Sequence, residues 1–274
     1  MDEQKVLQYS QASLQDFADC HRRFFYRYIA HLAWPAVESE PVIEAEKLMQ
    51  SGEQFHLLLR QYFSGVPVDK LEESAFLVGD LREWWQNFLA ADLELKDAIL
   101  FPEKVLTVPL GDTRLVGKFD LVAMHPDGRT VIYDWKTSQR MPSRQSLAAR
   151  WQTIVYPYLL AKGGAILHQG AAIQPDKISM VYWYTNFPDQ PIVFQYSAAD
   201  MEADEQALLS LIREIESRNG IEEFELALDE KYCKYCVYRS LCDRGIEAGG
   251  ELEMEFEPET EFNLDFDQIQ EIEF

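Results

Sequence analysis

The 274-residue sequence predicts an α/β fold in which a mixed central sheet is flanked by helices and preceded by a helical N-terminal part. Three observations support this fold class. Segments with helical and strand periodicity follow each other in the order helices, three strands, a helix, two strands and a helix. The composition, 47% hydrophobic and 13% aromatic, can fill a sizeable core. The length fits one large domain, which we place at residues 1–246, followed by a tail at residues 247–274.

The N-terminal part is predicted to be helical. A first helix has Ser13 as its N-cap, with Asp16 three residues later, and runs to about Ile29 because large apolar side chains recur at helical spacing. Two more helical stretches follow, at about 44–63 and 71–95. We therefore treat residues 40–98 as a helical insertion that precedes the sheet.

A β-hairpin around Asp127 carries the strongest chemical signal. The turn sequence HPDGR at residues 125–129 lies between two apolar runs, and Pro, Asp and Gly favour tight turns. Folding about Asp127 places Asp120 opposite Asp134, with Cβ atoms about 5 Å apart. Lys136 then points to the same sheet face as Asp134.

These charged groups are costly to bury in an otherwise apolar hairpin unless they have a partner. A divalent cation held by the two carboxylates would offset that cost, so the hairpin indicates a metal-dependent phosphodiesterase. The alternative is a structural salt bridge between Asp134 and Lys136, or a hairpin edge whose polar face lies in water.

The rest of the chain completes the sheet and its helical cover. We expect strands near 104–110, 114–124, 130–136, 177–185 and 192–196, with helices at 146–160 and 198–218.

The net charge of −22 excludes a uniformly basic nucleic-acid-binding surface. Residues 245–274 hold 11 acidic residues and no Lys or Arg, which leaves 25 basic against 36 acidic residues, a net charge of −11, in the rest. The tail is interpreted as an edge strand, a disordered solvating segment, a docking segment for a basic partner, or a DNA mimic that covers the protein's own cleft. Basic clusters at 21–27, 140–150 and 231–244 are candidate nucleic-acid contacts, although ordinary solvated surface is the better explanation of any single cluster.

The N-terminus lacks the basic and then apolar pattern of a signal peptide, and no run of 18 apolar residues could span a membrane. We therefore expect a cytoplasmic protein without membrane contact, in which disulfides are rare.

Four cysteines predict a shared metal site instead. Cys233, Cys236 and Cys242 form a C-x2-C-x5-C pattern, and Cys20 supplies a distant fourth thiol. Structural zinc and an iron–sulfur cluster both accept four thiolates, and the spacing does not choose between them. Such a site would staple the first helix to residues 232–243 and close a loop of more than 200 residues. Unligated thiols are the simpler alternative.

Several short motifs follow one another along the chain: Gly52-x3-His56, Gly117-x2-Asp120, Asp134-Trp135-Lys136, Gln152-x3-Tyr156 and the four cysteines. In this order they resemble the motifs of the RecB-like PD-(D/E)XK nucleases, and most of all those of their iron–sulfur group, which includes the CRISPR-associated RecB-like exonucleases and the AddB nuclease domain. The resemblance covers most of residues 10–243.

The resemblance implies a restriction-endonuclease-like fold with a cysteine-ligated metal staple. It also implies a metal-dependent DNA nuclease, most simply an exonuclease, in DNA repair, recombination or CRISPR-type DNA processing. DNA that is single-stranded or has free ends would be the substrate, and a helicase or other protein a partner. Two other hypotheses remain open: a non-catalytic scaffold subunit of a helicase–nuclease assembly, stapled by iron–sulfur or zinc, and a zinc-stapled binding module.

The resemblance also implies roles for single residues. Mg²⁺ or Mn²⁺ would bind to His56, Asp120, Asp134 and the Trp135 carbonyl. Lys136 would orient the attacking water or stabilise the transition state, and a [4Fe–4S] cluster would bind to the four cysteines. Gln152 and Tyr156 share one helix face and would contact Lys136 or the DNA backbone.

Overall fold

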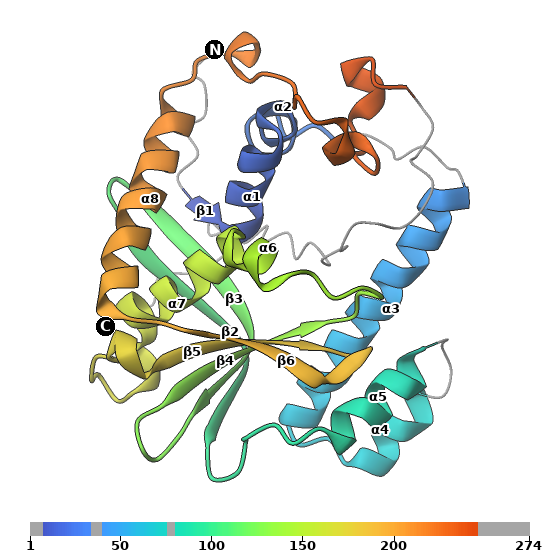
Figure 1. Cartoon of the computed structure of the whole chain (residues 1–274), viewed down its shortest axis with the longest axis vertical. Helices are drawn as coiled ribbons and strands as arrows, with labels where there is room; N and C mark the ends of the chain where they lie inside the picture. Colours follow the sequence, from blue (N-terminus) through green and yellow to red (C-terminus); the bar gives the residue numbers. More distant parts are fainter. Residues whose placement is uncertain (1–7, 34–39, 76–79, 246–274) are drawn as a thin grey trace, which may run out of the picture.

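A computed structural model describes residues 8–33, 40–75 and 80–245 of the chain (Figure 1). A six-stranded mixed sheet forms the centre, with helices on both faces, as predicted. The strands are β1 (Gln8–Ser10), β2 (Ile99–Leu110), β3 (Thr113–Met124), β4 (Thr130–Lys136), β5 (Ile178–Tyr184) and β6 (Phe187–Gln195). The α-helices are α1 (Gln11–Asp19), α2 (His21–Phe24), α3 (Glu40–Phe63), α4 (Val68–Ala75), α5 (Leu81–Ala90), α6 (Arg144–Ala148), α7 (Trp151–Gly163) and α8 (Ala198–Glu216).

The long strand β3 organises the sheet because it changes partners along its length. The strand order is β1-β3-β4-β5-β6, and β2 pairs with β3 along the remaining edge. The edge of β3 that faces away from β2 has two partners: residues 114–116 pair in parallel with β1, whereas residues 121–124 pair antiparallel with β4. Residues 117–120 lie between these two ladders, so a gap opens in the sheet beside the GKFD segment.

The predicted hairpin is present. The turn is closed by hydrogen bonds from the His125 N–H to the Arg129 carbonyl (2.8 Å) and from the Gly128 N–H to the His125 carbonyl (2.9 Å). Gly128 has φ +84°, a conformation that glycine adopts without steric cost. Leu121 pairs with Tyr133, in the register of a hairpin centred on Asp127.

The first helix differs from the prediction in both start and length. Its N-cap is Ser10, whose hydroxyl accepts from the Ser13 N–H, while the Ser13 hydroxyl accepts from the Ser10 N–H. This reciprocal cap satisfies two amides that a start at Ser13 would leave unpaired. At Cys20 the backbone is extended (φ −161°, ψ 107°), so the chain breaks there and continues as α2 and a π-helical turn over Phe25–Ile29.

Two other predicted helices are each divided in two. The stretch at 71–95 contains α4 and α5, with residues 76–79 outside the described part. The stretch at 146–160 divides at Arg150, where the backbone is extended. The Trp151 N–H that begins α7 donates to the Gln15 side chain of α1 (3.2 Å).

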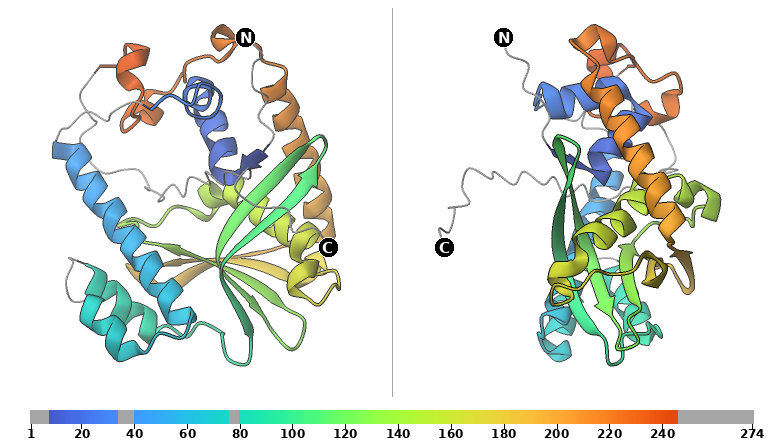
Figure 2. Two further views of the ribbon diagram at one scale, coloured as in Figure 1. Left: turned by 180° about the vertical axis from the view of Figure 1, so that it is seen from behind. Right: turned by 90° about the vertical axis from the view of Figure 1, so that its left-hand side faces the viewer.

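Helices lie on both faces of the sheet (Figure 2), and a cluster of buried apolar side chains fills the space on each face. Alternation within the strands sends Ile132 and Tyr182 into one cluster with α1, α7 and α8, and Tyr133 and Trp183 into the other with α3, α4 and α5. None of the helices in the described ranges is long and apolar enough to cross a membrane.

Candidate active site

A cavity of about 230 Å³ lies at the gap between β1 and β4. Its walls come from α1, α3, β2, β3, β4 and α7, and it contains the site residues predicted from the hairpin, the α3 histidine and the α7 Gln–Tyr pair. The lining residues are Gln11, Glu53, His56, Leu57, Arg60, Glu103, Lys118, Asp120, Asp134, Trp135, Lys136, Gln152 and Tyr156.

The Asp120 carboxylate is held from two sides. One oxygen accepts from the Trp135 N–H of β4 (2.9 Å), and the other lies 3.1 Å from Nδ1 of His56 on α3. The backbone pairing of β3 with β4 ends at Leu121, and beyond it the Asp120 carboxylate, in place of a backbone carbonyl, accepts the hydrogen bond from the Trp135 N–H. The Trp135 ring itself is buried in the opposite hydrophobic cluster, so Trp135 meets the cavity through its backbone.

His56 and Asp120 shift each other's ionisation. Burial alone would lower the pKa of the His56 imidazole, but the charge and hydrogen bond of Asp120 oppose it, and the pKa is raised. Burial would likewise raise the pKa of Asp120, but His56 and the Trp135 N–H hold it below its ordinary value.

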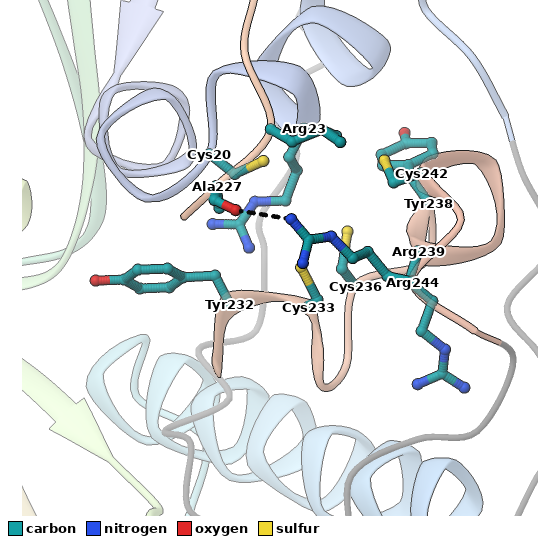
Figure 3. A pocket seen from close by; sticks show the side chains of 11 residues that line it. Cys20, Arg23, Ala227, Tyr232, Cys233, Cys236, Tyr238, Arg239, Cys242 and Arg244 are labelled. Atoms are coloured by element: carbon teal, nitrogen blue, oxygen red, sulfur yellow. Dashed lines mark hydrogen bonds between the residues drawn. The ribbon is translucent and has the colours of Figure 1, made fainter. Parts of the chain in front are cut away.

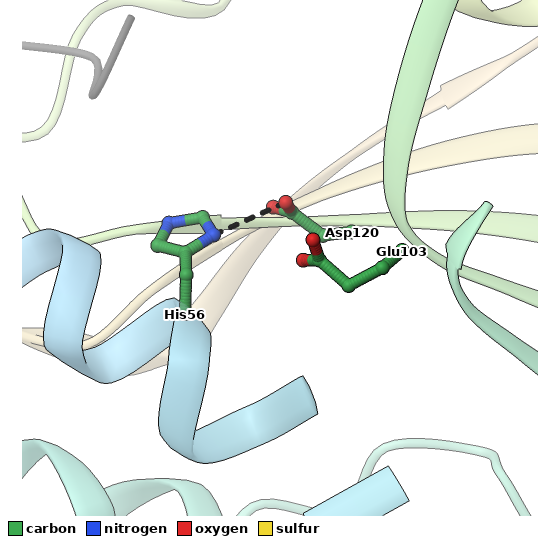
Figure 4. Close-up of side chains that lie close together, drawn as sticks. All are labelled: His56, Glu103 and Asp120. Carbon is green, nitrogen blue, oxygen red and sulfur yellow. Dashed lines mark hydrogen bonds and ion pairs between the residues drawn. The ribbon is translucent and has the colours of Figure 1, made fainter. Parts of the chain in front are cut away.

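Glu103 belongs to this site and was missed in the sequence analysis. One ligand atom each from His56, Glu103 and Asp120 lie within 4.8 Å of one another (Figure 4). Glu103 has φ +52°, a left-handed conformation that is uncommon for a non-glycine residue and that frequently marks functional sites. It could have been found by counting, because Glu103 and Asp120 are equidistant from the Gly111–Asp112 turn that joins β2 and β3.

Lys136 and Asp134 form a buried ion pair at 2.9 Å, with side chains that are only 8% and 4% exposed. Gln152 bridges the two: its carbonyl oxygen accepts from Lys136 (3.0 Å) and its amide donates to Asp134 (2.8 Å). The salt bridge considered as the structural alternative is therefore present, within the cavity. In the described part of the chain, Asp134 does not belong to the group of possible metal ligands that His56, Glu103 and Asp120 form.

Tyr156 lies one helical turn after Gln152 and also lines the cavity. Its ring packs against Phe119 at 4.9 Å between centroids. Burial, together with the charges of Asp134 and Asp120, raises the pKa of its hydroxyl well above the usual value, so Tyr156 remains a neutral hydrogen-bonding group.

Both motif glycines allow close packing around the site. A Cβ at Gly52 would lie 2.9 Å from the Thr137 hydroxyl oxygen, and a Cβ at Gly117 would lie 2.5 Å from a methyl of Leu159 on α7. The absence of these side chains therefore lets α3 approach the end of β4 and lets α7 lie against β3.

The four cysteines line a separate, small cavity (Figure 3). Cys20 comes from the break between α1 and α2, and the other three from the 3-10 turns Glu230–Cys233 and Arg239–Cys242 and the residues between them. Burial and the neighbouring thiols raise the pKa of Cys242 to about 11, and burial also raises those of Cys233 and Cys236. Thiols gathered in this way stay protonated unless a metal ligates them as thiolates.

The contact between the N-terminal helices and the segment at 224–238 does not depend on the thiols alone. Arg22 donates its backbone N–H to the Glu225 carbonyl (3.1 Å) and its side chain to the Phe224 carbonyl (2.8 Å). The Phe224 ring lies among the aromatic rings of α1 and α2, and the Tyr238 hydroxyl donates to the Leu32 carbonyl (2.9 Å).

Part of the candidate basic clusters has an internal role. Arg23 and Arg27 both pair with Asp16 at 2.7 Å, and Arg144 donates to the Val193 carbonyl (2.7 Å). Buried Arg239 donates to the Lys234 carbonyl (2.7 Å). These contacts favour structural roles for the arginines. The predicted acidic tail lies outside the described residues.

Comparisons with known proteins agree with the motif pattern. A family model described as the PD-(D/E)XK nuclease superfamily matches residues 8–243. Solved structures that match include SSO0001, with 14% identity over 87% of each chain and a TM-score of 0.39. Another is a candidate exonuclease from Eubacterium rectale, with 12% identity over 82% of this chain and 85% of that chain and a TM-score of 0.47. No curated protein sequence matches significantly.

Proposed function

Because this chain belongs to the PD-(D/E)XK nuclease superfamily, we propose that it is a divalent-metal-dependent DNA exonuclease that acts on single strands or free ends. The observation that carries the proposal is the convergence of His56, Glu103, Asp120, Asp134 and Lys136 on one cavity from four elements, α3, β2, β3 and β4. Buried charges of both signs in one cavity are typical of catalytic sites.

The donor set fits a hard divalent cation. Two carboxylates and an imidazole within 4.8 Å suit Mg²⁺ or Mn²⁺, and the imidazole favours Mn²⁺. The cavity wall also contains Oε1 of Gln11, a buried carbonyl oxygen that has no hydrogen-bond partner among the described residues. When bound, the cation would supply an activated water and neutralise negative charge at the scissile phosphate.

We assign the cation to Glu103, Asp120 and His56, with Asp134 and the Trp135 carbonyl beside them. Trp135 and His56 orient the Asp120 carboxylate, which reduces the reorganisation needed for ligation. Neutral imidazole is the ligating form, so His56 must lose the proton that Asp120 stabilises.

Lys136 acts on the substrate side of this site. Asp134 and Gln152 hold its ammonium in place, so it can orient the attacking water or stabilise charge on the phosphate without first losing side-chain freedom. Gln152 and Tyr156 are positioning residues in this scheme, Gln152 through its bonds to Lys136 and Asp134, and Tyr156 as a neutral hydroxyl in the cavity wall.

The cavity has a volume of about 230 Å³, which is compatible with a single phosphate group beside the proposed metal-binding residues. We take single strands or free ends as the substrate from the motif resemblance. We place the reaction in DNA repair, recombination or CRISPR-type DNA processing, with a helicase or another protein as partner, on the motif resemblance.

We further propose a [4Fe–4S] cluster at the cysteines, which staples residues 232–243 to the N-terminal helices of a domain that spans 1–246. Four thiolates accept either a zinc ion or an iron–sulfur cluster, and the motif resemblance to the iron–sulfur group favours the cluster. Anaerobically purified protein is expected to be brown, whereas zinc protein would be colourless.

Cleavage of end-labelled DNA tests the proposed function. Single-stranded and duplex substrates are incubated with Mg²⁺ or Mn²⁺ and with wild type, Asp120→Asn or Lys136→Ala protein. We expect progressive shortening of the single strand by wild type, and a loss of more than about 100-fold in both variants. Absence of cleavage by wild-type protein with an intact metal staple would refute the enzyme and favour the scaffold hypothesis. Internal cuts on a circular single strand would refute an exonuclease.

A further inference from the structure

Each carboxylate at the centre of the cavity is matched with a cationic or protonatable side chain of the same protein. Asp134 pairs with Lys136, Asp120 with His56, and Glu103 with Lys118. His56, Asp120, Asp134 and Lys136 have roles in the scheme above, whereas Lys118 has none.

Lys118 is placed to meet a substrate. It lies on β3 two residues before Asp120, so both side chains leave the same face of the strand. Lys118 lines the cavity and is 24% exposed, compared with 8% for Lys136. It also lies between the β1 and β4 ladders, in the part of β3 that pairs with neither of these strands.

Glu103 is the partner that competes for Lys118. Its left-handed backbone (φ +52°) turns the carboxylate to a point within 4.8 Å of both the His56 and Asp120 ligand atoms. The same carboxylate pairs with the Lys118 ammonium. Glu103 therefore faces two cationic partners, Lys118 within the protein and a divalent cation from solution, and the divalent cation has the larger charge.

We propose that Lys118 binds the phosphate of the substrate. Without a divalent cation, Glu103 holds Lys118 in an ion pair, and Lys118 is released when Glu103 ligates the cation. Without the cation, Lys118 neutralises the charge of Glu103 and so reduces the repulsion between the carboxylates of Glu103 and Asp120. With the cation bound, the Lys118 ammonium is released beside the reacting phosphate and contributes a positive charge to an otherwise acidic protein. The inference rests on the proposed nuclease function and deepens it, because DNA affinity becomes coupled to the metal through one side-chain pair.

Metal binding without DNA gives the first test. Titration of the full-length protein with Mn²⁺ is followed by calorimetry for wild type, Lys118→Gln and, as a charge-matched control, Lys104→Gln, which changes a β2 lysine outside the cavity. We expect Lys118→Gln to bind Mn²⁺ at least threefold more tightly, because Glu103 loses its internal competitor, and Lys104→Gln to match wild type. Equal Mn²⁺ affinity in wild type and Lys118→Gln would overturn the proposal.

DNA binding gives the second test. Binding of a fluorescently labelled oligothymidylate is measured in Ca²⁺, an oxygen-ligated cation used here to separate binding from cleavage, and in EDTA. In Ca²⁺, Lys118→Gln is expected to bind about five- to tenfold more weakly than wild type, with a salt slope lower by about 0.7, as for one phosphate contact on a single strand. In EDTA the two proteins should bind alike, and Glu103→Gln should bind more tightly than wild type because its lysine is already released.

The outcomes separate the two hypotheses. Equal losses by Lys118→Gln in Ca²⁺ and EDTA, or no loss in Ca²⁺, would overturn the metal-released lysine while the nuclease stands. Wild-type protein that binds no DNA under either condition and cleaves none would overturn the proposed function, and this inference with it.

Discussion

Replacement of Gly52 by alanine is expected to lower activity while leaving stability nearly unchanged. Gly52 lies on α3 one turn before His56, and its missing side chain faces the residue that follows Lys136. An alanine Cβ would stand 2.9 Å from the Thr137 hydroxyl oxygen, against an ordinary contact of at least 3.4 Å. If the Thr137 side chain keeps its rotamer, relief of the clash requires a movement of about 0.5 Å between α3 and the end of β4.

The expected loss of kcat follows from the displacement of His56 relative to Lys136. His56 is on α3 and Lys136 precedes Thr137, so the movement separates two groups that must act on the same phosphate. A misplacement of 1 Å can cost about 100-fold in rate, so half that distance should cost about tenfold in kcat. Stability changes little, because alanine gains about 1 kcal/mol over glycine within a helix, which offsets the cost of packing α3 slightly farther from Thr137.

A second substitution tests this reasoning. Thr137→Ala removes the hydroxyl, so kcat of the Gly52→Ala/Thr137→Ala protein should return to that of Thr137→Ala alone. Single-turnover cleavage of labelled DNA measures the rate, and thermal unfolding measures stability in the same preparations. Wild-type kcat in Gly52→Ala, or an equally large loss in the double variant, would show that close approach at residue 52 does not position the site.

Three further predictions concern the buried polar groups and the staple. Gln152→Leu should lower the free energy of unfolding by about 2–4 kcal/mol and abolish cleavage, because Lys136 and Asp134 each lose a charged hydrogen bond; urea unfolding that matches wild type would contradict this. Burial raises the pKa of Asp204 from 3.8 to about 6, so the folded protein binds its proton more tightly and loses stability as the pH rises from about 4 to 6. Asp204→Asn should therefore stabilise the protein by about 1 kcal/mol at pH 7.5, after allowance for partial exposure, and by nothing below pH 4, as melting temperatures across pH will test. Cys236→Ala should lose bound metal and melt about 10 °C lower, because the metal no longer helps to close a loop of more than 200 residues, and a metal-free variant with the wild-type melting temperature would rule out the staple.

Much of the fold can be read from the linear pattern because its causes are local. Tight-turn residues at 125–129 and alternating side chains determine the hairpin and its register, and the β4 bounds at Thr130 and Lys136 match the prediction. Helix ends were predicted less well, since they depend on partners. The N-cap moved from Ser13 to Ser10, and the division before α7 depends on a side chain from α1.

The candidate site likewise contains residues that the sequence predicted and one residue, Glu103, that depends on contacts between distant segments. Asp120, Asp134 and Lys136 were predicted from the hairpin pattern, and His56, Gln152 and Tyr156 from the family resemblance. All six line one cavity, and their roles stay predictions. Glu103 was missed because it belongs to no motif; its relation to Asp120 depends on pairing across the β2–β3 hairpin and on a left-handed backbone.

Spacing along the chain thus identifies the chemistry that the residues can perform, since side-chain type and local periodicity are properties of short segments. The place where that chemistry occurs depends on contacts between distant segments. A change of partner along β3 opens the sheet at residues 117–120, and the missing side chains at Gly52 and Gly117 let α3 and α7 close around the opening. The pairing of Glu103 with Lys118 arises from the same long-range packing, because the two residues come from different strands and meet only at this gap.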